Sequence, residues 1–304
     1  METPVTYSSE GVAVRRTQPA LGAEISGVDL SQPLPPRAAA AIRNALHAHG
    51  IIFFRDQKLT RDQYLDFARI FAKSMSQPFV LYPKQPEPIP DYPQMLTLKT
   101  EFKDGKIHAP ADTWHTDEVM REIPSVVTIN RLHYGPTFGG DTAFSSAVAA
   151  YEGLDEETKR QIEGLTVLYS KHLANDRKDS KNAQQTGLLS LPPIEHPAVR
   201  IHPDTGQRVL FVSETASQLV GVEGPDGERL LRRLAYEFTR PEYQMRLTWA
   251  PDTIAVWDNI LVQHRAVPDY NAPRYLERLT IAGLSRPIGP TGTESRLRQA
   301  ESLN

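Results

Sequence analysis

Proline and glycine interrupt this chain so often that only short regular elements fit between them. The 304 residues include 25 prolines and 18 glycines. Short segments rich in β-branched and aromatic residues, separated by such turn residues, are typical of an antiparallel barrel or jelly roll. The sequence therefore predicts a mainly β fold with flanking helices. Strands are expected within 12–30 and at Ser125–Arg131, Thr142–Ser145, Leu165–Ser170, Val199–His202, Arg208–Val212, Met245–Trp249, Thr253–Trp257 and Tyr275–Ala282.

The first third of the chain carries clear helix signals. Pro35–His49 is predicted to be a helix that stops at Gly50, because glycine is the usual residue after a helix. The apolar run Ile51–Phe54 then suits a buried strand. Thr60 is expected to begin a second helix, with Gln63 completing a capping box. Two further helices are expected in part of Ala147–Glu163 and at Asp226–Arg240.

No internal repeat or linker divides the sequence, which predicts one domain over 1–304, with a core of about 12–286 and a tail at 287–304. Two segments differ in character. Residues 77–112 contain seven prolines, and 171–190 form a polar stretch. Long loops in a compact domain are usually functional, so both are predicted to act as a lid over a site.

Composition excludes several classes of function. The net charge of −3 gives no basic face for nucleic acid. No apolar run approaches the roughly 20 residues that span a bilayer, and the start lacks a secretion signal. Because there is no cysteine, any metal must be held by histidine or a carboxylate. We expect a cytoplasmic protein without nucleic-acid or membrane partners.

Two places in the chain read His-x-Asp. In the first, His115 and Asp117 are two residues apart, and on a strand such residues point to one face, where both could reach one ion. In the second, His202 and Asp204 lie between two predicted strands, so this segment is interpreted as a hairpin turn whose acid faces solvent. The other histidines are expected to be structural: His47, His49, His108, His133, His172 and His196.

His264, from a distant segment, is the candidate third ligand. Two histidines and one carboxylate are typical of non-haem iron oxygenases, and the remaining positions on the metal stay open. Three alternatives remain at this point: a strand-end histidine bonded to backbone, a zinc hydrolase using the same three ligands, or a non-catalytic barrel that binds a metal or a carboxylate.

Two arginines begin the last predicted strand. Arg274 and Arg278 are four residues apart and so share a strand face with Leu276 and Thr280. If that face is the barrel interior, the two cations need anionic partners, which a dicarboxylate and an acidic substrate would supply. The alternative is an edge strand with solvated arginines and an outward Glu277.

Several further motifs occur in order along the chain. They are Gly22–Leu30, Phe53–Gln57, Trp114–Asp117, Gly139–Thr142, His202-Pro203 with Gly206, and Ile254–Asn259 leading to Gln263-His264-Arg265. Together, from about Leu21 to Arg286, they resemble the taurine dioxygenase family, which includes alkylsulfatases and aryloxyalkanoate dioxygenases.

The resemblance implies a double-stranded β-helix (a cupin-like jelly roll) and an oxygenase that uses Fe(II), O2 and 2-oxoglutarate, releasing succinate and CO2. It implies that the iron ligands are His115, Asp117 and His264. It assigns the distal carboxylate of 2-oxoglutarate to Thr142 and Arg274. It places Arg278 against the anionic group of the substrate and in reach of the cosubstrate.

The resemblance also indicates where the substrate pocket differs. Gln77 and Val80 stand where taurine-specific members carry histidine and tyrosine, and Ala111 and Met120 replace an asparagine and a phenylalanine. The pocket is therefore predicted to be larger and more apolar, and taurine is not the expected substrate. A small anionic molecule is expected instead. We also expect a homo-oligomer, either a dimer or a tetramer.

Overall fold

The computed structural model describes residues 6–73, 76, 78–82, 89–100, 102–103, 106–107, 111–170 and 191–298. Its largest sheet has eight strands in the order β1-β2-β3-β4-β16-β8-β18-β5. All neighbours in it are antiparallel except β3 and β4. The strands are β1 (Thr6–Ser9), β2 (Val12–Arg16), β3 (Ala23–Ser26), β4 (Ile51–Phe54), β16 (Ile254–Asp258), β8 (Val127–Tyr134), β18 (Arg274–Ile281) and β5 (Leu96–Thr100).

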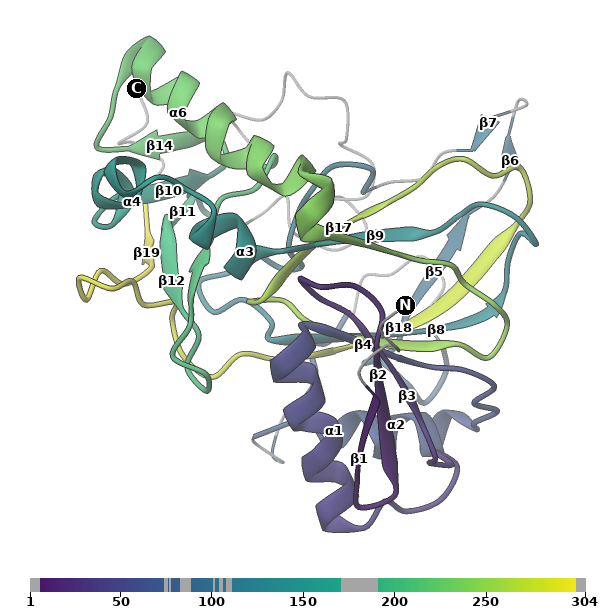
Figure 1. Cartoon of the computed structure of the whole chain (residues 1–304). Coiled ribbons are helices and arrows are strands. Elements are labelled where there is room, and N and C mark those ends of the chain that lie inside the picture. Colours follow the sequence, from purple (N-terminus) through teal and green to yellow (C-terminus); the bar gives the residue numbers. More distant parts are fainter. Residues whose placement is uncertain are drawn as a thin grey trace.

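A second, three-stranded sheet completes the jelly roll and lies above β8 and β18 in Figure 1. It consists of β15 (Gln244–Leu247), β9 (Thr142–Ser146) and β17 (Val262–Ala266). To one side, a four-stranded sheet contains β14 (Gln218–Val220), β10 (Thr166–Tyr169), β11 (Ile194–Pro197) and β19 (Arg296–Leu297). Two strand pairs remain, β12 (Val199–Ile201) with β13 (Arg208–Leu210), and β6 (Phe102–Lys103) with β7 (Lys106–Ile107). The predicted mainly β, jelly-roll fold is confirmed.

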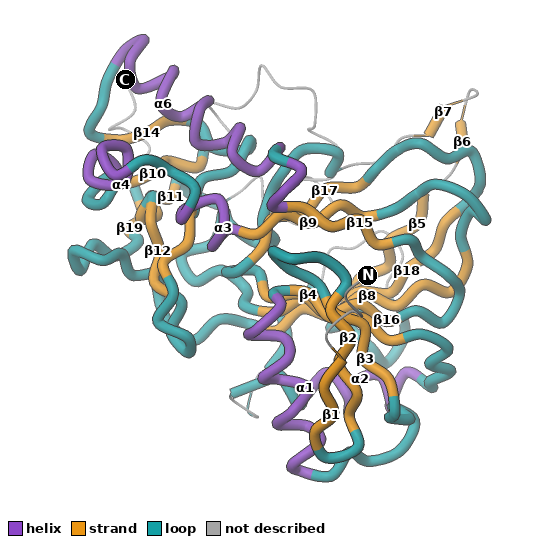
Figure 2. Tube along the Cα trace, in the orientation of Figure 1, coloured by secondary structure: helices purple, strands orange, loops and turns teal. Residues whose placement is uncertain are grey.

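Helices flank the sheets at both ends of the molecule (Figures 1 and 2). The first two, α1 and α2, lie below the large sheet, and α6 lies at the opposite end. In the described residues the helices are α1 (Pro36–His49), α2 (Arg61–Arg69), α3 (Ala147–Glu152), α4 (Glu156–Ile162), α6 (Gly224–Tyr236) and the 3-10 turns η2 (Glu237–Thr239) and η3 (Pro241–Tyr243). None of them combines the length and the apolar character needed to cross a bilayer.

The predicted helix ends are confirmed. Helix α1 stops before Gly50, whose φ of 68° is a conformation that glycine adopts without a side-chain clash. At α2 the Thr60 side chain accepts from the Gln63 backbone N–H while the Gln63 side chain accepts from the Thr60 N–H. The predicted capping box is thus present.

Strand β4 separates two hydrophobic clusters. Ile51 and Phe53 point to the side shared with the three-stranded sheet, and Ile52 and Phe54 point to the side packed on α1 and α2. Because successive side chains alternate across a sheet, a strand covered on both faces must be apolar throughout. This explains why the four consecutive apolar residues form a strand and not a helix.

The prediction of a loop over 77–112 was wrong for the residues of β5. Within it, β5 pairs with β18 from Leu96 to Thr100, opposite Arg278 and Arg274. The proposed lid at 171–190 lies outside the described residues, so the lid stays a prediction. The single-domain boundaries also stay a prediction.

Replacing Thr60 by alanine should lower the free energy of unfolding by about 1 kcal/mol, because one backbone donor at the start of α2 loses its acceptor. Urea denaturation monitored by circular dichroism measures this. Thr60→Ser, which keeps the oxygen, should lie close to the unaltered protein. An equal loss in both variants would show that the threonine methyl group, and not the cap, supplies the stability.

Candidate metal centre

Two reciprocal backbone hydrogen bonds join His115 to His264. The His115 N–H donates to the His264 carbonyl over 3.1 Å, and the His264 N–H donates to the His115 carbonyl over 2.9 Å. Directly paired residues of an antiparallel bridge project their side chains to the same side. The two imidazole rings accordingly lie side by side, with centroids 4.3 Å apart.

Asp117 completes a cluster with the two histidines. Its Oδ1 lies 4.0 Å from His115 Nε2 and 3.8 Å from His264 Nε2. An ion bound at about 2.0–2.2 Å can be shared by two ligand atoms only if they lie within roughly 4.2 Å of each other. Both pairs meet this condition. The described residues thus place the three sequence-predicted ligands together, and their ligand atoms could hold one metal ion.

One detail of the sequence prediction was wrong. His115 and Asp117 are not on a regular strand: His115 forms an isolated bridge, and the chain turns at Asp117. Glu118 then adopts a positive φ of 59°. The bridge sets the direction of the His115 side chain, and the turn at Asp117 places its carboxylate near the imidazole.

Each histidine presents its Nε2 to the cluster. His115 Nδ1 lies 2.8 Å from the Thr113 carbonyl, and because a carbonyl only accepts, the neutral tautomer that fits this contact carries its proton on Nδ1 and its lone pair on Nε2. Neither ring nitrogen of His264 has a hydrogen-bond partner among the described residues. Burial, together with the nearby His115, lowers the pKa of His264 well below its ordinary value, so this imidazole stays neutral and able to bind a metal.

Asp117 is held in its charged form. Burial alone would raise its pKa, but the Arg278 guanidinium, the two histidines and a hydrogen bond from Thr128 together bring the pKa below the ordinary range. Arg278 Nη1 donates to Oδ1 over 2.9 Å and Thr128 Oγ1 donates to Oδ2 over 2.7 Å. A buried, ionised carboxylate is the third ligand that the cluster requires.

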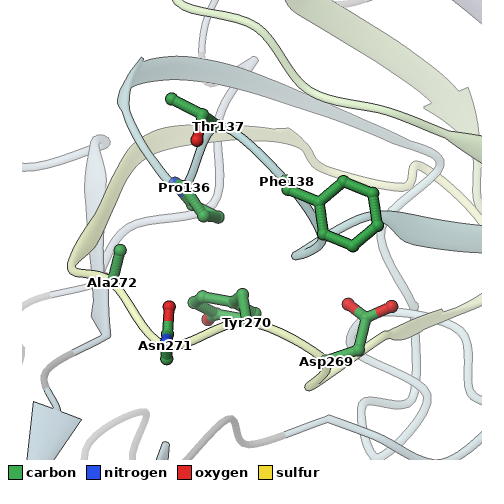
Figure 3. Close-up of a pocket in the computed structure, with 7 residues that line it drawn as sticks. All are labelled: Pro136, Thr137, Phe138, Asp269, Tyr270, Asn271 and Ala272. Atoms are coloured by element: carbon green, nitrogen blue, oxygen red, sulfur yellow. The ribbon is translucent and has the colours of Figure 1, made fainter.

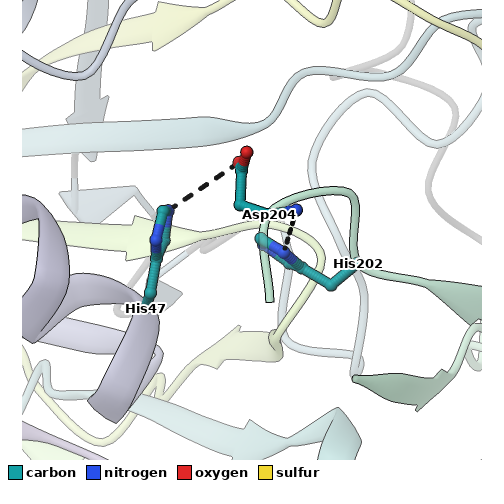
Figure 4. A group of neighbouring side chains, drawn as sticks. All are labelled: His47, His202 and Asp204. Carbon is teal, nitrogen blue, oxygen red and sulfur yellow. Dashed lines mark hydrogen bonds and ion pairs between the residues drawn. The ribbon is translucent and has the colours of Figure 1, made fainter. Parts of the chain in front are cut away.

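The second His-x-Asp segment forms a different structure (Figure 4). His202 Nε2 lies 2.9 Å from Asp258 Oδ2, and its Nδ1 accepts from the backbone N–H groups of Asp204 and Thr205. Both ring nitrogens are therefore used. Although His47 also lies near Asp204, the carboxylate pairs with Lys73. The predicted hairpin turn is confirmed by the pairing of β12 with β13.

A buried cation and a hydroxyl share one neighbour, Trp249. The Arg274 guanidinium lies over the Trp249 ring at 5.5 Å, and Trp249 Nε1 donates to Thr142 Oγ1 over 3.0 Å. Arg274 is only 7% exposed, and its Nε has no hydrogen-bond partner among the described residues. Burial lowers the pKa of this guanidinium from its ordinary value. The arrangement suits an anion that accepts hydrogen bonds from both groups.

The alternative of solvated arginines on an edge strand was wrong. Strand β18 lies between β8 and β5, and a bulge between Tyr275 and Leu276 adjusts its register. Besides Asp117, Arg278 contacts Asn130, whose Oδ1 accepts from Arg278 Nε over 3.1 Å. Arg278 thus stands beside the metal cluster, and Arg274 stands beside Trp249 and Thr142.

Glu277 is not an outward neighbour, as that alternative supposed. It is fully buried on the opposite face of β18, where Arg61 and Tyr275 donate to Oε1 and His133 Nε2 lies 2.9 Å from Oε2. Burial would raise its pKa, but these three partners lower it to about 2. The residue spacing along β18 could not reveal this network, because one partner, Arg61, comes from α2, which is remote in the sequence.

Two of the predicted substrate residues, Val80 and Ala111, lie close to site residues in the fold. The Val80 N–H donates to the carbonyl of Thr280, two residues beyond Arg278, and the Ala111 carbonyl accepts from Ala266, two residues beyond His264. Met120 is half-buried against the core. Gln77 lies outside the described residues. Their role in substrate binding stays a prediction.

A pocket of about 390 Å³ opens between two loops, 136–138 and 269–272 (Figure 3). No residue of the metal cluster lines it. Tyr270, which lines the pocket, lies with its ring centroid 6.0 Å from the Arg274 guanidinium, but neither Arg274 nor Thr142 lines the pocket. This pocket is therefore outside the candidate site.

Comparison with known proteins agrees with the geometry. Residues 13–280 match the model of the taurine catabolism dioxygenase TauD, TfdA family. The chain is 33% identical to the alpha-ketoglutarate-dependent sulfate ester dioxygenase of Pseudomonas putida over 91% of each chain. It is 27% identical to the alpha-ketoglutarate-dependent 2,4-dichlorophenoxyacetate dioxygenase of Burkholderia sp. strain RASC, over 88% of this chain and 94% of the relative. A crystal structure of a taurine dioxygenase from Burkholderia xenovorans superposes with a TM-score of 0.80 at 31% identity, over 95% of each chain.

The chain belongs to the taurine catabolism dioxygenase TauD, TfdA family. It is a 2-oxoglutarate-dependent non-haem iron dioxygenase that acts on a small molecule. The alternatives of a zinc hydrolase and of a non-catalytic barrel are thereby set aside.

Removing any of the three ligand side chains should abolish the weak metal-to-ligand charge-transfer band that Fe(II) and 2-oxoglutarate develop in anaerobic solution. The variants are His115→Ala, Asp117→Ala and His264→Ala, and absorption spectroscopy reads the band. His202→Gln is the control, because both nitrogens of His202 are engaged elsewhere. Loss of the band in His202→Gln with retention in His115→Ala would overturn the choice between the two His-x-Asp segments.

Proposed function

We propose that His115, Asp117 and His264 hold Fe(II), and that Arg274 and Thr142 bind the distal carboxylate of 2-oxoglutarate. The observation that carries this proposal is Arg274, a cation that is only 7% exposed, has an unpaired Nε and has no carboxylate within ion-pair distance among the described residues. A buried cation without an ion-pair partner is costly, and an anionic cosubstrate would remove that cost. The donor set of two imidazoles and one carboxylate suits Fe(II).

When bound, iron with 2-oxoglutarate and O2 supplies an oxidation that releases succinate and CO2. The residues of the chain orient the reactants and exclude water. Trp249 holds the Thr142 hydroxyl through a hydrogen bond. The Phe144 and Trp257 rings shield His264 from water, because their centroids lie 5.9 Å and 4.9 Å from that of the imidazole.

The substrate is proposed to be a small anion with an apolar body larger than taurine. Arg278 supplies a cation beside the cluster, with its side chain 17% exposed. Val80, Ala111 and Met120 offer apolar surface where a small zwitterion would need hydrogen-bonding partners. The sulfate ester and dichlorophenoxyacetate substrates named for the two relatives share this plan of an anionic end and an apolar body.

Two further predictions concern the whole protein. The lack of cysteine supports a cytoplasmic location, where disulfides are rare. The exposed side chains of Phe138, Tyr236 and Leu284 support a homo-oligomer, because large exposed apolar residues often mark contacts between subunits. We propose both, with dimer or tetramer to be decided by light scattering.

Arg274→Ala should raise the concentration of 2-oxoglutarate needed for half-maximal succinate formation by two orders of magnitude or more, since breaking one side of a buried ion pair costs about 3–5 kcal/mol. Arg278→Ala should mainly raise the requirement for the primary substrate. Steady-state titration of each ligand against each variant separates the two effects. Equal effects of both variants on both ligands would show that the two roles are shared.

Taurine should support little succinate formation above the uncoupled background, even at millimolar concentration. A pocket discriminates steeply only when its polar groups are satisfied by the right ligand, and the predicted pocket residues are largely apolar. Succinate and sulfite are measured across a panel of sulfonates, alkyl sulfates and aryloxy acids. Release of sulfite from taurine in step with succinate would contradict this view of the pocket, while leaving the metal site intact.

A further inference from the structure

The two oxygens of Asp117 have different surroundings. Oδ1 faces His115 and His264 and accepts a 2.9 Å hydrogen bond from Arg278 Nη1, whereas Oδ2 accepts a 2.7 Å hydrogen bond from Thr128 Oγ1. Thr128 lies on β8 and is fully buried. The carboxylate, which could otherwise rotate about its last bond, is thus held by Arg278 at Oδ1 and by Thr128 at Oδ2.

The Thr128 hydroxyl is itself held by Asn259. The Asn259 Nδ2 donates to Thr128 Oγ1 over 2.9 Å and to Ser125 Oγ over 3.0 Å. A hydroxyl has only one hydrogen. Because Thr128 Oγ1 accepts from the amide, its hydrogen is free to point at the carboxylate of Asp117. The amide must be the donor here, since a threonine that donated to Asn259 could not also donate to Asp117.

Asn259 is anchored at two further points. Its carbonyl accepts from Thr116 Oγ1 over 2.6 Å, and its N–H donates to the Val126 carbonyl over 2.9 Å. Thr116 stands between the two ligands His115 and Asp117. Asn259 also follows β16 at the turn that leads to β17, which carries His264. One residue therefore contacts the segments that carry all three predicted ligands.

We propose that Thr128 and Asn259 are positioning residues, which form a hydrogen-bond relay that presents Asp117 Oδ1, and only Oδ1, to the metal. This inference rests on the proposed metal centre. It assigns Asn259 a role through Thr128 and not through direct contact with the ion. Partners of this kind, which orient a ligand from behind, are expected to strengthen metal binding by about 10–100-fold.

The relay is tested by metal binding to the metal-free protein, with Co(II) as the probe and calorimetry and visible absorption as readouts. Thr128→Val should weaken Co(II) binding about 10–100-fold and alter the absorption bands, because Oδ2 loses its hydrogen-bond donor and Arg278 alone then orients the carboxylate. Thr128→Ser keeps the hydroxyl and should restore binding to near that of the unaltered protein.

Thr166→Val provides a matched control. Thr166 is a buried threonine on β10 whose hydroxyl donates over 2.9 Å to Glu195, a buried carboxylate that also pairs with an arginine. The same chemical group is lost there, away from the candidate metal centre. Co(II) affinity should be unchanged in Thr166→Val, even if its melting temperature falls as much as that of Thr128→Val.

A double-mutant cycle tests whether the two residues act in series. Asn259→Ala should weaken Co(II) binding in the unaltered protein, and should add little once Thr128 is valine. Independent additive losses would overturn the relay, as would unchanged affinity in either Thr128→Val or Asn259→Ala. No Co(II) binding by the unaltered protein would instead overturn the metal centre itself, so the two failures are distinguishable.

Discussion

The bridge between His115 and His264 is the contact on which the candidate site depends. Its two backbone hydrogen bonds join segments that lie far apart in the chain and set both imidazoles on one side. The side chains need no adjustment of their own to come together, because the backbone pairing already determines their direction. The surrounding sheets hold this bridge in place: β17 pairs with β9, and β16 pairs with both β4 and β8.

The site concentrates charge where the fold would otherwise place apolar residues. Asp117, Arg274 and Glu277 are all buried, and the last two are three positions apart on β18. Buried charges stabilise a protein poorly compared with packed apolar side chains, so their presence is better explained by function than by stability. Glu277 lies within 2.9 Å of Arg61, Tyr275 and His133, whereas Arg274 has no carboxylate within ion-pair distance among the described residues. That difference separates a structural network from a binding site.

Much of this could be predicted from the sequence. The turn residues and short apolar segments indicated the β fold, and His115, Asp117 and His264 were predicted as ligands before their positions were known. Sequence could not show that β5 pairs with β18, because the prolines of the surrounding segment 77–112 suggested an irregular loop. It could not reveal the neighbours of Glu277 either. Such contacts are made across sheets by residues remote in sequence, where periodicity carries no information.

Asn259 shows the same limit at the site itself. It was recognised only as part of a motif, and its contacts with Thr128 and Thr116 depend on the turn between β16 and β17.

The most direct test of the proposed metal centre is a crystal structure of the protein with Mn(II) and 2-oxoglutarate, prepared without oxygen. The account predicts Mn(II) bound by His115 Nε2, His264 Nε2 and Asp117 Oδ1, with the distal carboxylate of 2-oxoglutarate on Arg274 and Thr142. Mn(II) bound elsewhere, or Arg274 without a carboxylate partner, would contradict it.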